Sequence, residues 1–446
     1  MAPMVPGTRL FSGALALLVV LLLALPAQAI DIREVTSPKG ITGWLIKDDT
    51  VPLFTMSFAF RGGAALDPKG KEGLAEMTSS LLDEGAGKLD SQAFQAKLEN
   101  NSIDLRFGAS ADSFSGTLRA LTEYRDMAAD LLRMALTEPR FDAAPVERIR
   151  GQYLSHVRRR SERPSYAARR AWRRALFRDH PYGRELNGTE SSLKSITTKD
   201  MRAFVENRLA RDVLVVAGVG DLDEKAFGAL MDRAFGALPA KAERGELSEA
   251  RISGAGRVIV TEREIPQSVV YFGHKGIKRN HPDFYAAYVV NYILGGGGLT
   301  SRLATEIREK RGLAYSVYTR LVTLEHAGLI RGRVATANAR VAESIALIRE
   351  QWAKLAAQGV TKEELSDAKS YLTGSFYTRL NSTRRIAGLL VGIQLDDMGI
   401  DYLKTRNEKI NAVTMEDAKR VARELFRPGD LTISVAGRPK GVEPRP

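Results

Sequence analysis

The chain has 446 residues, of which none is cysteine and five are histidine, and its formal net charge is +13. The lack of cysteine excludes disulfide bonds, a cysteine nucleophile, a thiolate zinc site and lipid-modified cysteine. With 44% hydrophobic and 27% charged residues the composition is globular, and this length predicts two or more domains. The positive charge alone is compatible with polyanions, anionic membranes or acidic substrates as partners.

Residues 1–29 have the pattern of a secretory signal peptide. Arg9 and the amino terminus give a positive start, residues 14–25 form an unbroken apolar run, and Ala27-Gln28-Ala29 places small residues at the cleavage-site spacing. A retained membrane anchor is less favoured, because the run is shorter than the roughly 20 residues that a span needs. We therefore expect an exported protein, located in the periplasm of a Gram-negative cell.

The rest of the chain repeats four features at a nearly constant offset of 210 to 218 residues. Each copy has a strand-like run after a proline, a helix-like segment that ends in glycine, a second helix-like segment that begins at threonine, and a final β-rich run after aspartate. The matched pairs are Pro52 and Pro266, Gly85 and Gly295, Thr198 and Thr414, and Asp212 and Asp430. Repetition of this kind indicates duplicated domains.

Two related domains are predicted over residues 31–240 and 257–446, joined by a polar, glycine-bearing linker over 241–256. In each half, β-rich runs alternate with long amphipathic segments such as residues 127–136 and 342–357. We expect an α+β fold in which helices pack on one face of a mixed sheet in each domain. The alternation by itself also permits a doubly wound α/β fold.

A helix is predicted over residues 73–85, where Leu74, Met77, Leu81 and Leu82 recur at helical spacing and a glycine ends the segment. Its setting, a strand ending in RGGAALDP followed by G-L-A, resembles the zinc peptidases of the pitrilysin (insulinase) family. Those enzymes carry H-x-x-E-H directly after the G-L-A. The spacing puts two zinc-binding histidines and a water-activating glutamate on one helix face.

The positions of this chain that match the motif are Glu76, Ser79 and Ser80, so both histidines and the general base are missing. The resemblance places the family's third ligand within residues 146–157, where our alignment puts His156. Three oxygen groups and one imidazole do not make a zinc site for hydrolysis, so we expect no metal and no cofactor in this chain. A hydrolytic triad of either serine with His156 is less favoured, because both serines lie inside the expected helix without a nucleophile elbow.

A glycine run over residues 295–298 opens the corresponding segment of the second half. No lysine follows at P-loop spacing, so nucleotide binding is not favoured. The longer pattern GGGG-LTSRL, RE and KRGLAYSV closely resembles the C-terminal signature of the pitrilysin family, and residues 180–184 and 365–369 match further family segments. The resemblance spans nearly the whole mature chain and implies two homologous domains with mostly antiparallel sheets.

In half-length members of that family, two subunits face each other and enclose a chamber. An arginine and a tyrosine seven residues apart in one subunit reach the substrate at the zinc of the other, and the matching residues here are Arg308 and Tyr315. A guanidinium and a phenol can donate hydrogen bonds to a peptide carbonyl or to the developing oxyanion. Without the family context, pairing of Arg308 with Glu306 or Glu309 and simple packing of Tyr315 would be the default interpretation.

Residues 158–178 hold nine arginines against the single acidic residue Glu162. The interleaved Tyr166 and Trp172 superficially suggest nucleic-acid binding, which an exported protein rarely performs. A basic chamber wall that favours acidic peptide segments, or an interface with an acidic partner, is the favoured interpretation of the Arg158–Arg178 segment.

Our hypothesis from the sequence is a non-catalytic subunit that pairs in the periplasm with a homologous, zinc-bearing peptidase subunit. The partner would supply zinc and H-x-x-E-H, and this chain would complete the peptide chamber with Arg308 and Tyr315. Two alternatives stay open: a structural or binding protein on a degenerate peptidase scaffold, and a hydrolase that uses a different site.

Overall fold

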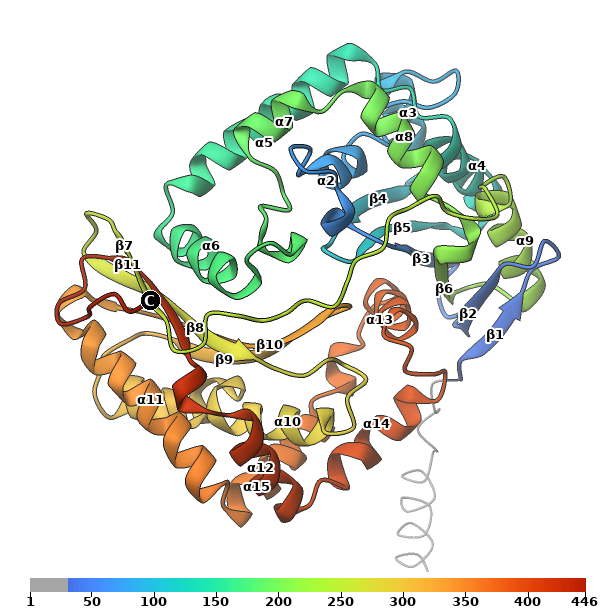
Figure 1. The fold of residues 1–446 in the computed structure, drawn as a ribbon. Helices are drawn as coiled ribbons and strands as arrows, with labels where there is room; N and C mark the ends of the chain where they lie inside the picture. The colour runs from blue at the N-terminus through green and yellow to red at the C-terminus, as the bar shows by residue number, and fades with distance from the viewer. Residues whose placement is uncertain (1–30) are drawn as a thin grey trace, which may run out of the picture.

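The computed structural model describes residues 31–446, and the predicted signal peptide over residues 1–29 lies outside them. Two β-sheets form the frame of the molecule (Figure 1). The strands of the first sheet are β1 (Arg33–Thr36), β2 (Thr42–Lys47), β3 (Leu53–Arg61), β4 (Asp104–Ala109), β5 (Ser113–Leu121) and β6 (Leu214–Gly220). The strands of the second sheet are β7 (Val258–Glu262), β8 (Gln267–Lys275), β9 (Val317–Leu324), β10 (Ala327–Ala337) and β11 (Thr432–Gly437).

The two sheets have the same topology apart from the edge strand β1. Their strand orders are β1-β2-β6-β3-β5-β4 and β7-β11-β8-β10-β9. In each sheet one pair is parallel, β2 with β6 and β7 with β11, and the other neighbours are antiparallel. The predicted duplication and the α+β class are confirmed, and the doubly wound alternative is excluded because it requires a mainly parallel sheet.

Helices cover the outer face of each sheet. The helices of the first half are α2 (Leu74–Ser79), α3 (Ser91–Asn100), α4 (Arg125–Thr137), α5 (Ala143–Ser161), α6 (Pro164–Phe177), α7 (Glu190–Ser195), α8 (Thr198–Arg208) and α9 (Glu224–Phe235). Those of the second half are α10 (Phe284–Asn291), α11 (Val341–Gln358), α12 (Lys362–Gly374), α13 (Thr383–Leu395), α14 (Tyr402–Asn411) and α15 (Met415–Leu425). The amphipathic segments predicted over residues 127–136 and 342–357 lie within α4 and α11.

The central strands are buried on both faces, because each sheet is also covered by one helix from the other half. In β3 the large side chains, such as Phe58, enter the core of the first half, while small residues such as Ala59 face α13. Thr55 of β3 lies 2.8 Å from the hydroxyl of Thr383 at the start of α13. In the same way, α6 packs against β8 and β11 of the second sheet.

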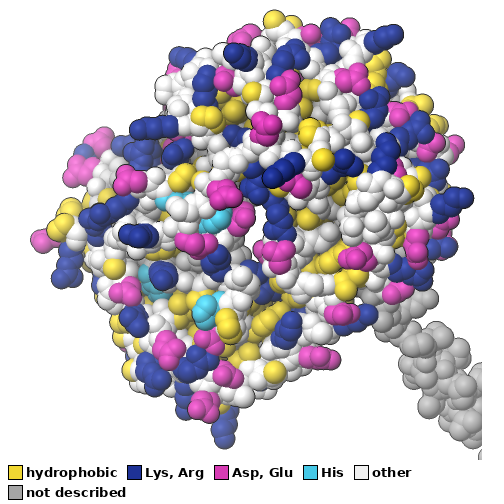
Figure 2. All heavy atoms as spheres, turned by 45° about the vertical axis from the view of Figure 1, so that its right-hand side comes forward, with side chains coloured by type: hydrophobic (Ala, Val, Ile, Leu, Met, Phe, Trp, Pro, Cys, Tyr) yellow, Lys and Arg dark blue, Asp and Glu magenta, His cyan; other side chains and the backbone are white. Residues whose placement is uncertain are grey.

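The prediction had helices on one face of each sheet only. Because α6 and α13 each pack on the sheet of the other half, both faces of each sheet are covered. Residues 241–256, the predicted linker, contain neither helix nor strand. Figure 2 shows a hollow between the two halves, with both basic and acidic side chains around it. Within residues 31–446 no helix is both long and apolar enough to cross a membrane.

Candidate functional site

The positions that match the zinc motif lie on α2, which is shorter than the predicted helix over residues 73–85. Gly73, in a left-handed conformation (φ 94°), precedes the helix, and the buried carboxylate of Asp67 accepts a hydrogen bond from the backbone N–H of Ala75. The helix ends after Ser79, and the chain turns towards Gly85 (φ 110°) and a short antiparallel bridge beyond it. Only one turn and a half of helix therefore presents Glu76, Ser79 and Ser80.

Tyr153 of α5 lies beside these residues and is hydrogen-bonded to them. Its hydroxyl donates a hydrogen bond to the backbone oxygen of Glu76 at 3.2 Å and therefore accepts one from the hydroxyl of Ser80 at 2.7 Å. The buried hydroxyl of Ser79 donates to the same Glu76 carbonyl at 2.7 Å. Burial raises the pKa of Tyr153 to about 12, so the phenol stays protonated. The hydroxyls of Ser79, Ser80 and Tyr153 and the backbone oxygen of Glu76 thus form one hydrogen-bonded network.

His156 lies one turn further along α5, exposed at the rim of a cavity of about 570 Å³. Glu76 and Ser80 line the same cavity, but neither serine is hydrogen-bonded to His156 among the described residues. Partial desolvation of the ring and the charges of Arg160 and Arg159 lower the pKa of His156, which favours the neutral imidazole. The geometry gives no support to a serine–histidine triad.

The donor set of this cavity does not fit a catalytic zinc ion. It offers one carboxylate (Glu76), one serine hydroxyl, one protonated phenol and one imidazole, whereas catalytic zinc takes three strong nitrogen, sulfur or carboxylate ligands. No cluster of three or more histidine, cysteine, aspartate or glutamate side chains suited to a metal occurs in residues 31–446. Sequence reasoning missed Tyr153, although it lies inside the window 146–157 predicted for the third ligand.

Asp83, in the turn after α2, makes the stability of this region depend on pH. Burial raises its pKa from 3.8 to about 6, and its carboxylate accepts from the Gln95 amide at 3.4 Å. Since the folded pKa lies above the unfolded one, stability is highest below pH 3.8 and falls as the pH rises towards 6. We expect Asp83→Asn to gain about 1–2 kcal/mol over the wild type at pH 7.5.

Urea unfolding of both proteins at pH 7.5 and pH 4 measures this effect. The gain should shrink at pH 4, where the wild-type carboxyl is protonated as well. An equal gain at both pH values would mean that lost packing or hydrogen bonding, rather than ionisation of Asp83, explains the difference.

The second signature forms two π-helical turns, η5 (Tyr292–Gly296) and η7 (Ala304–Glu309). Single π-helical turns inside helices occur often at functional sites. Arg308 lies in η7, and its guanidinium carbon is 5.3 Å from the centre of the Tyr315 ring, within the range of a cation–π contact. The side chain of Tyr315 is 87% exposed, so it does not pack into the core.

Glu306 does not pair with Arg308. Its carboxylate binds Lys310 and Arg311, each at 2.6 Å. Among residues 31–446, no carboxylate lies within 4 Å of the Arg308 guanidinium. The half-buried Arg308 and the exposed Tyr315 therefore form a pair without a carboxylate partner, and the default interpretation of an internal ion pair and a packed tyrosine does not hold.

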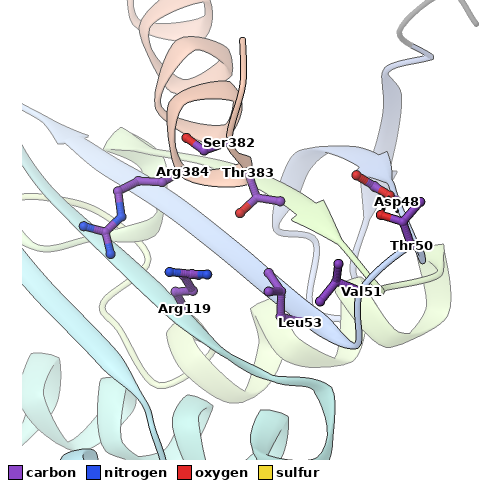
Figure 3. A pocket seen from close by; sticks show the side chains of 8 residues that line it. All are labelled: Asp48, Thr50, Val51, Leu53, Arg119, Ser382, Thr383 and Arg384. Carbon is purple, nitrogen blue, oxygen red and sulfur yellow. Dashed lines mark hydrogen bonds between the residues drawn. The ribbon is translucent and has the colours of Figure 1, made fainter.

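A second cavity, of about 320 Å³, lies where α13 meets the first sheet (Figure 3). Arg119 and Arg384 lie at one end of it, and Asp48 and Thr50 at the other. Its full lining is Asp48, Thr50, Val51, Leu53, Arg119, Ser382, Thr383 and Arg384. It shares no residue with the cavity at α2, and its lining offers neither a histidine nor a nucleophile with an adjacent base.

Comparison with known proteins places these features in a family. Residues 45–190 match the insulinase family (peptidase family M16), and residues 195–372 match the peptidase M16 inactive domain. The chain is 28% identical to the "Non-peptidase homolog YmxG" of Helicobacter pylori, over 96% of this chain and 98% of the relative. It is 30% identical to an uncharacterized zinc protease of Mycobacterium tuberculosis, over 67% of this chain and 69% of the relative.

A solved structure supports the same assignment. The peptidase M16 inactive domain from Pseudomonas fluorescens is 27% identical and superimposes with a TM-score of 0.85 over 93% of this chain and 99% of that chain. The similarity therefore extends over both sheets and their helices.

Proposed function

The chain belongs to the insulinase family, peptidase family M16, as an inactive member, and we propose that it completes the substrate chamber of a zinc-bearing homologue in the periplasm. The homologue supplies the zinc ion, which activates water for peptide hydrolysis, and this chain binds the peptide through Arg308 and Tyr315. The export pattern of residues 1–29 supports the periplasmic location.

One observation carries this proposal: the residues of the zinc motif are missing from this chain, whereas those of the second signature are present. At α2 the zinc ligands are missing and Tyr153 lies beside their positions, whereas Arg308 and the exposed Tyr315 lie together at the other signature. The guanidinium and the phenol can donate hydrogen bonds to a peptide carbonyl at the zinc site of a neighbouring subunit. A subunit that binds peptide at a neighbour's metal needs only the second signature.

The experiment is a reconstitution with the zinc-bearing M16 homologue of the same organism. The chain from residue 30 onwards is expected to show no peptidase activity alone and to co-elute with the homologue. The mixture should hydrolyse a fluorogenic peptide library, and a chelator should abolish this activity until zinc is added. The control replaces the motif glutamate of the homologue with glutamine, which should silence the mixture because the water-activating base is lost.

Two outcomes would contradict the proposal. A chain that elutes only as a homodimer, with the homologue fully active alone, would favour a scaffold protein without a catalytic partner. Chelator-resistant activity in the isolated chain would favour a hydrolase that uses a different site.

A further inference from the structure

The arginines of residues 158–178 fall into two groups in the structure. The first group has structural partners: Arg158 pairs with Glu190 at 2.8 Å, and Arg160 and Arg170 lie 3.9 and 3.6 Å from Glu185. Arg173 also belongs to it, because its guanidinium donates to backbone oxygens of the following loop. The second group has no carboxylate within 4 Å among residues 31–446. Its members are Arg159, Arg163, Arg169, Arg174 and Arg178.

Arg159, Arg160 and Arg169 line the cavity of about 570 Å³ beside α2. The side chain of Arg160 is 11% exposed, and its guanidinium lies 4.8 Å above the ring of Tyr166. The same ring lies 5.8 Å from the guanidinium of Arg169. Against these three cations the cavity lining has a single carboxylate, that of Glu76, so its net charge is positive.

The second sheet adds two arginines that have no carboxylate partner among the described residues. Arg320 of β9 and Arg331 of β10 are direct cross-strand partners, an arrangement in which like charges repel. Side chains alternate along a strand, so both share the face that carries Leu329 and Val322. That is the face against which α6 packs, and no carboxylate in the described chain lies within 4 Å of either guanidinium.

The helix α6 connects the two sets of arginines, because Arg169 belongs to it and Arg320 and Arg331 lie on the sheet face against which it packs. Burial lowers the pKa of Arg331, and the nearby positive charges of Arg320 and Arg169 lower it further. In Figure 1, α6, which carries Arg169, lies between α5 and the second sheet. We define the arginine cluster as Arg159, Arg160, Arg169, Arg320 and Arg331.

We propose that the arginine cluster binds an acidic peptide segment, with one glutamate or aspartate side chain in the cavity beside α2 and the next carboxylates on Arg320 and Arg331. Guanidinium groups bind carboxylates with two parallel hydrogen bonds, and partial burial strengthens such pairs. The cavity has the size of a ligand pocket, and no aliphatic residue is among those that line it. This proposal rests on the proposed function, because the acidic segment is part of the substrate peptide that the two subunits would enclose.

Binding to the isolated chain tests this proposal without the zinc-bearing homologue. The probe is a fluorescein-labelled peptide of alternating glutamate and alanine, and the comparison peptide has lysine in place of glutamate. Fluorescence anisotropy should show binding of the glutamate peptide only, weakening as salt is raised because the contacts are ionic. The double variant Arg159→Gln, Arg320→Gln removes two exposed charges of the cluster and should weaken binding about tenfold.

The matched control is Arg174→Gln, Arg423→Gln, which removes two exposed charges outside the cluster. It should change affinity by less than about twofold, since neither side chain lines the cavity beside α2 or belongs to β9 or β10. Equal weakening in the two double variants would overturn the proposal, as would equal binding of the glutamate and lysine peptides. So would binding of a single-stranded oligonucleotide of the same charge as tightly as the acidic peptide, since this would indicate an unselective polyanion surface.

Failure of this proposal and failure of the proposed function are distinguishable. If the acidic peptide binds through the cluster but the mixture of this chain and the homologue is inactive, the cluster proposal is supported and the proposed catalytic partnership is contradicted. An active mixture whose chain does not bind the acidic peptide would do the reverse.

Discussion

Replacement of Arg308 with alanine is expected to lower kcat/KM of the reconstituted pair by about 10²–10³-fold, without loss of subunit association. A guanidinium aimed at the peptide carbonyl stabilises the charge that develops on its oxygen, and such donors are strongest where water is excluded. Tyr315→Phe, which removes only the hydroxyl, should cost about tenfold or more if the phenol donates to the same oxygen. Steady-state kinetics with a fluorogenic peptide measure both effects.

Arg311→Ala is the matched control, because Arg311 lies three residues away and pairs with Glu306 at the surface. It should leave kcat/KM within about twofold of the wild type, as exposed ion pairs contribute little. If Arg308→Ala and Tyr315→Ala both leave peptide turnover unchanged, then the pair is not part of a shared site. Co-elution of each variant with the homologue separates loss of catalysis from loss of assembly.

Replacement of Trp172 with alanine is expected to lower the free energy of unfolding by about 3–5 kcal/mol. Trp172 of α6 is 1% exposed, belongs to the apolar cluster between α6 and the second sheet, and donates its indole N–H to the backbone oxygen of Thr432 at 3.1 Å. Its removal leaves a cavity at the contact between the halves. We therefore expect calorimetry to resolve two unfolding transitions where the wild type has one.

Trp352→Ala provides the comparison. Trp352 is also fully buried, and its indole N–H donates to Nε2 of His274 at 3.0 Å, but it lies inside the core of the second half. Its loss should be as destabilising as that of Trp172 yet should not split the transition. A single transition for Trp172→Ala, or a split for Trp352→Ala, would show that α6 does not couple the halves.

The sequence predicted the duplicated frame because the signals for it are local. A proline before a strand, a glycine after a helix and a threonine at the start of a helix recur in both halves. Thr414 caps α15, and α8 begins at the predicted Thr198 but is capped by Thr197, one residue earlier. The exchange of α6 and α13 could not be predicted, because an apolar stripe on a helix does not reveal which sheet it will cover. The alternation of large and small residues in β3 was the only hint of a second covered face.

The candidate site was predictable to a similar extent. The missing ligands at Glu76, Ser79 and Ser80 follow from residue identity alone, so no structure was needed to find them. The role of Tyr153 depends on the rotation of α5, which decides which of its residues faces α2, and an alignment by spacing favoured His156 instead. Likewise, the arginine-rich segment predicted a basic surface, but only the fold places α6, which carries Arg169, on the sheet face that carries Arg331.

The packing of α6 and α13 on the sheet of the opposite half also restricts how the two halves of the chain can move relative to each other. Each half contributes one helix that packs on the sheet of the other half, so the two halves share two apolar clusters. They cannot separate without exposing this apolar surface to water. A hinge within the chain would have to break these contacts, and a pivot between two chains would not. In the dimer that we propose, each chain is therefore expected to move as a rigid body, and a peptide would enter through rotation of one subunit against the other.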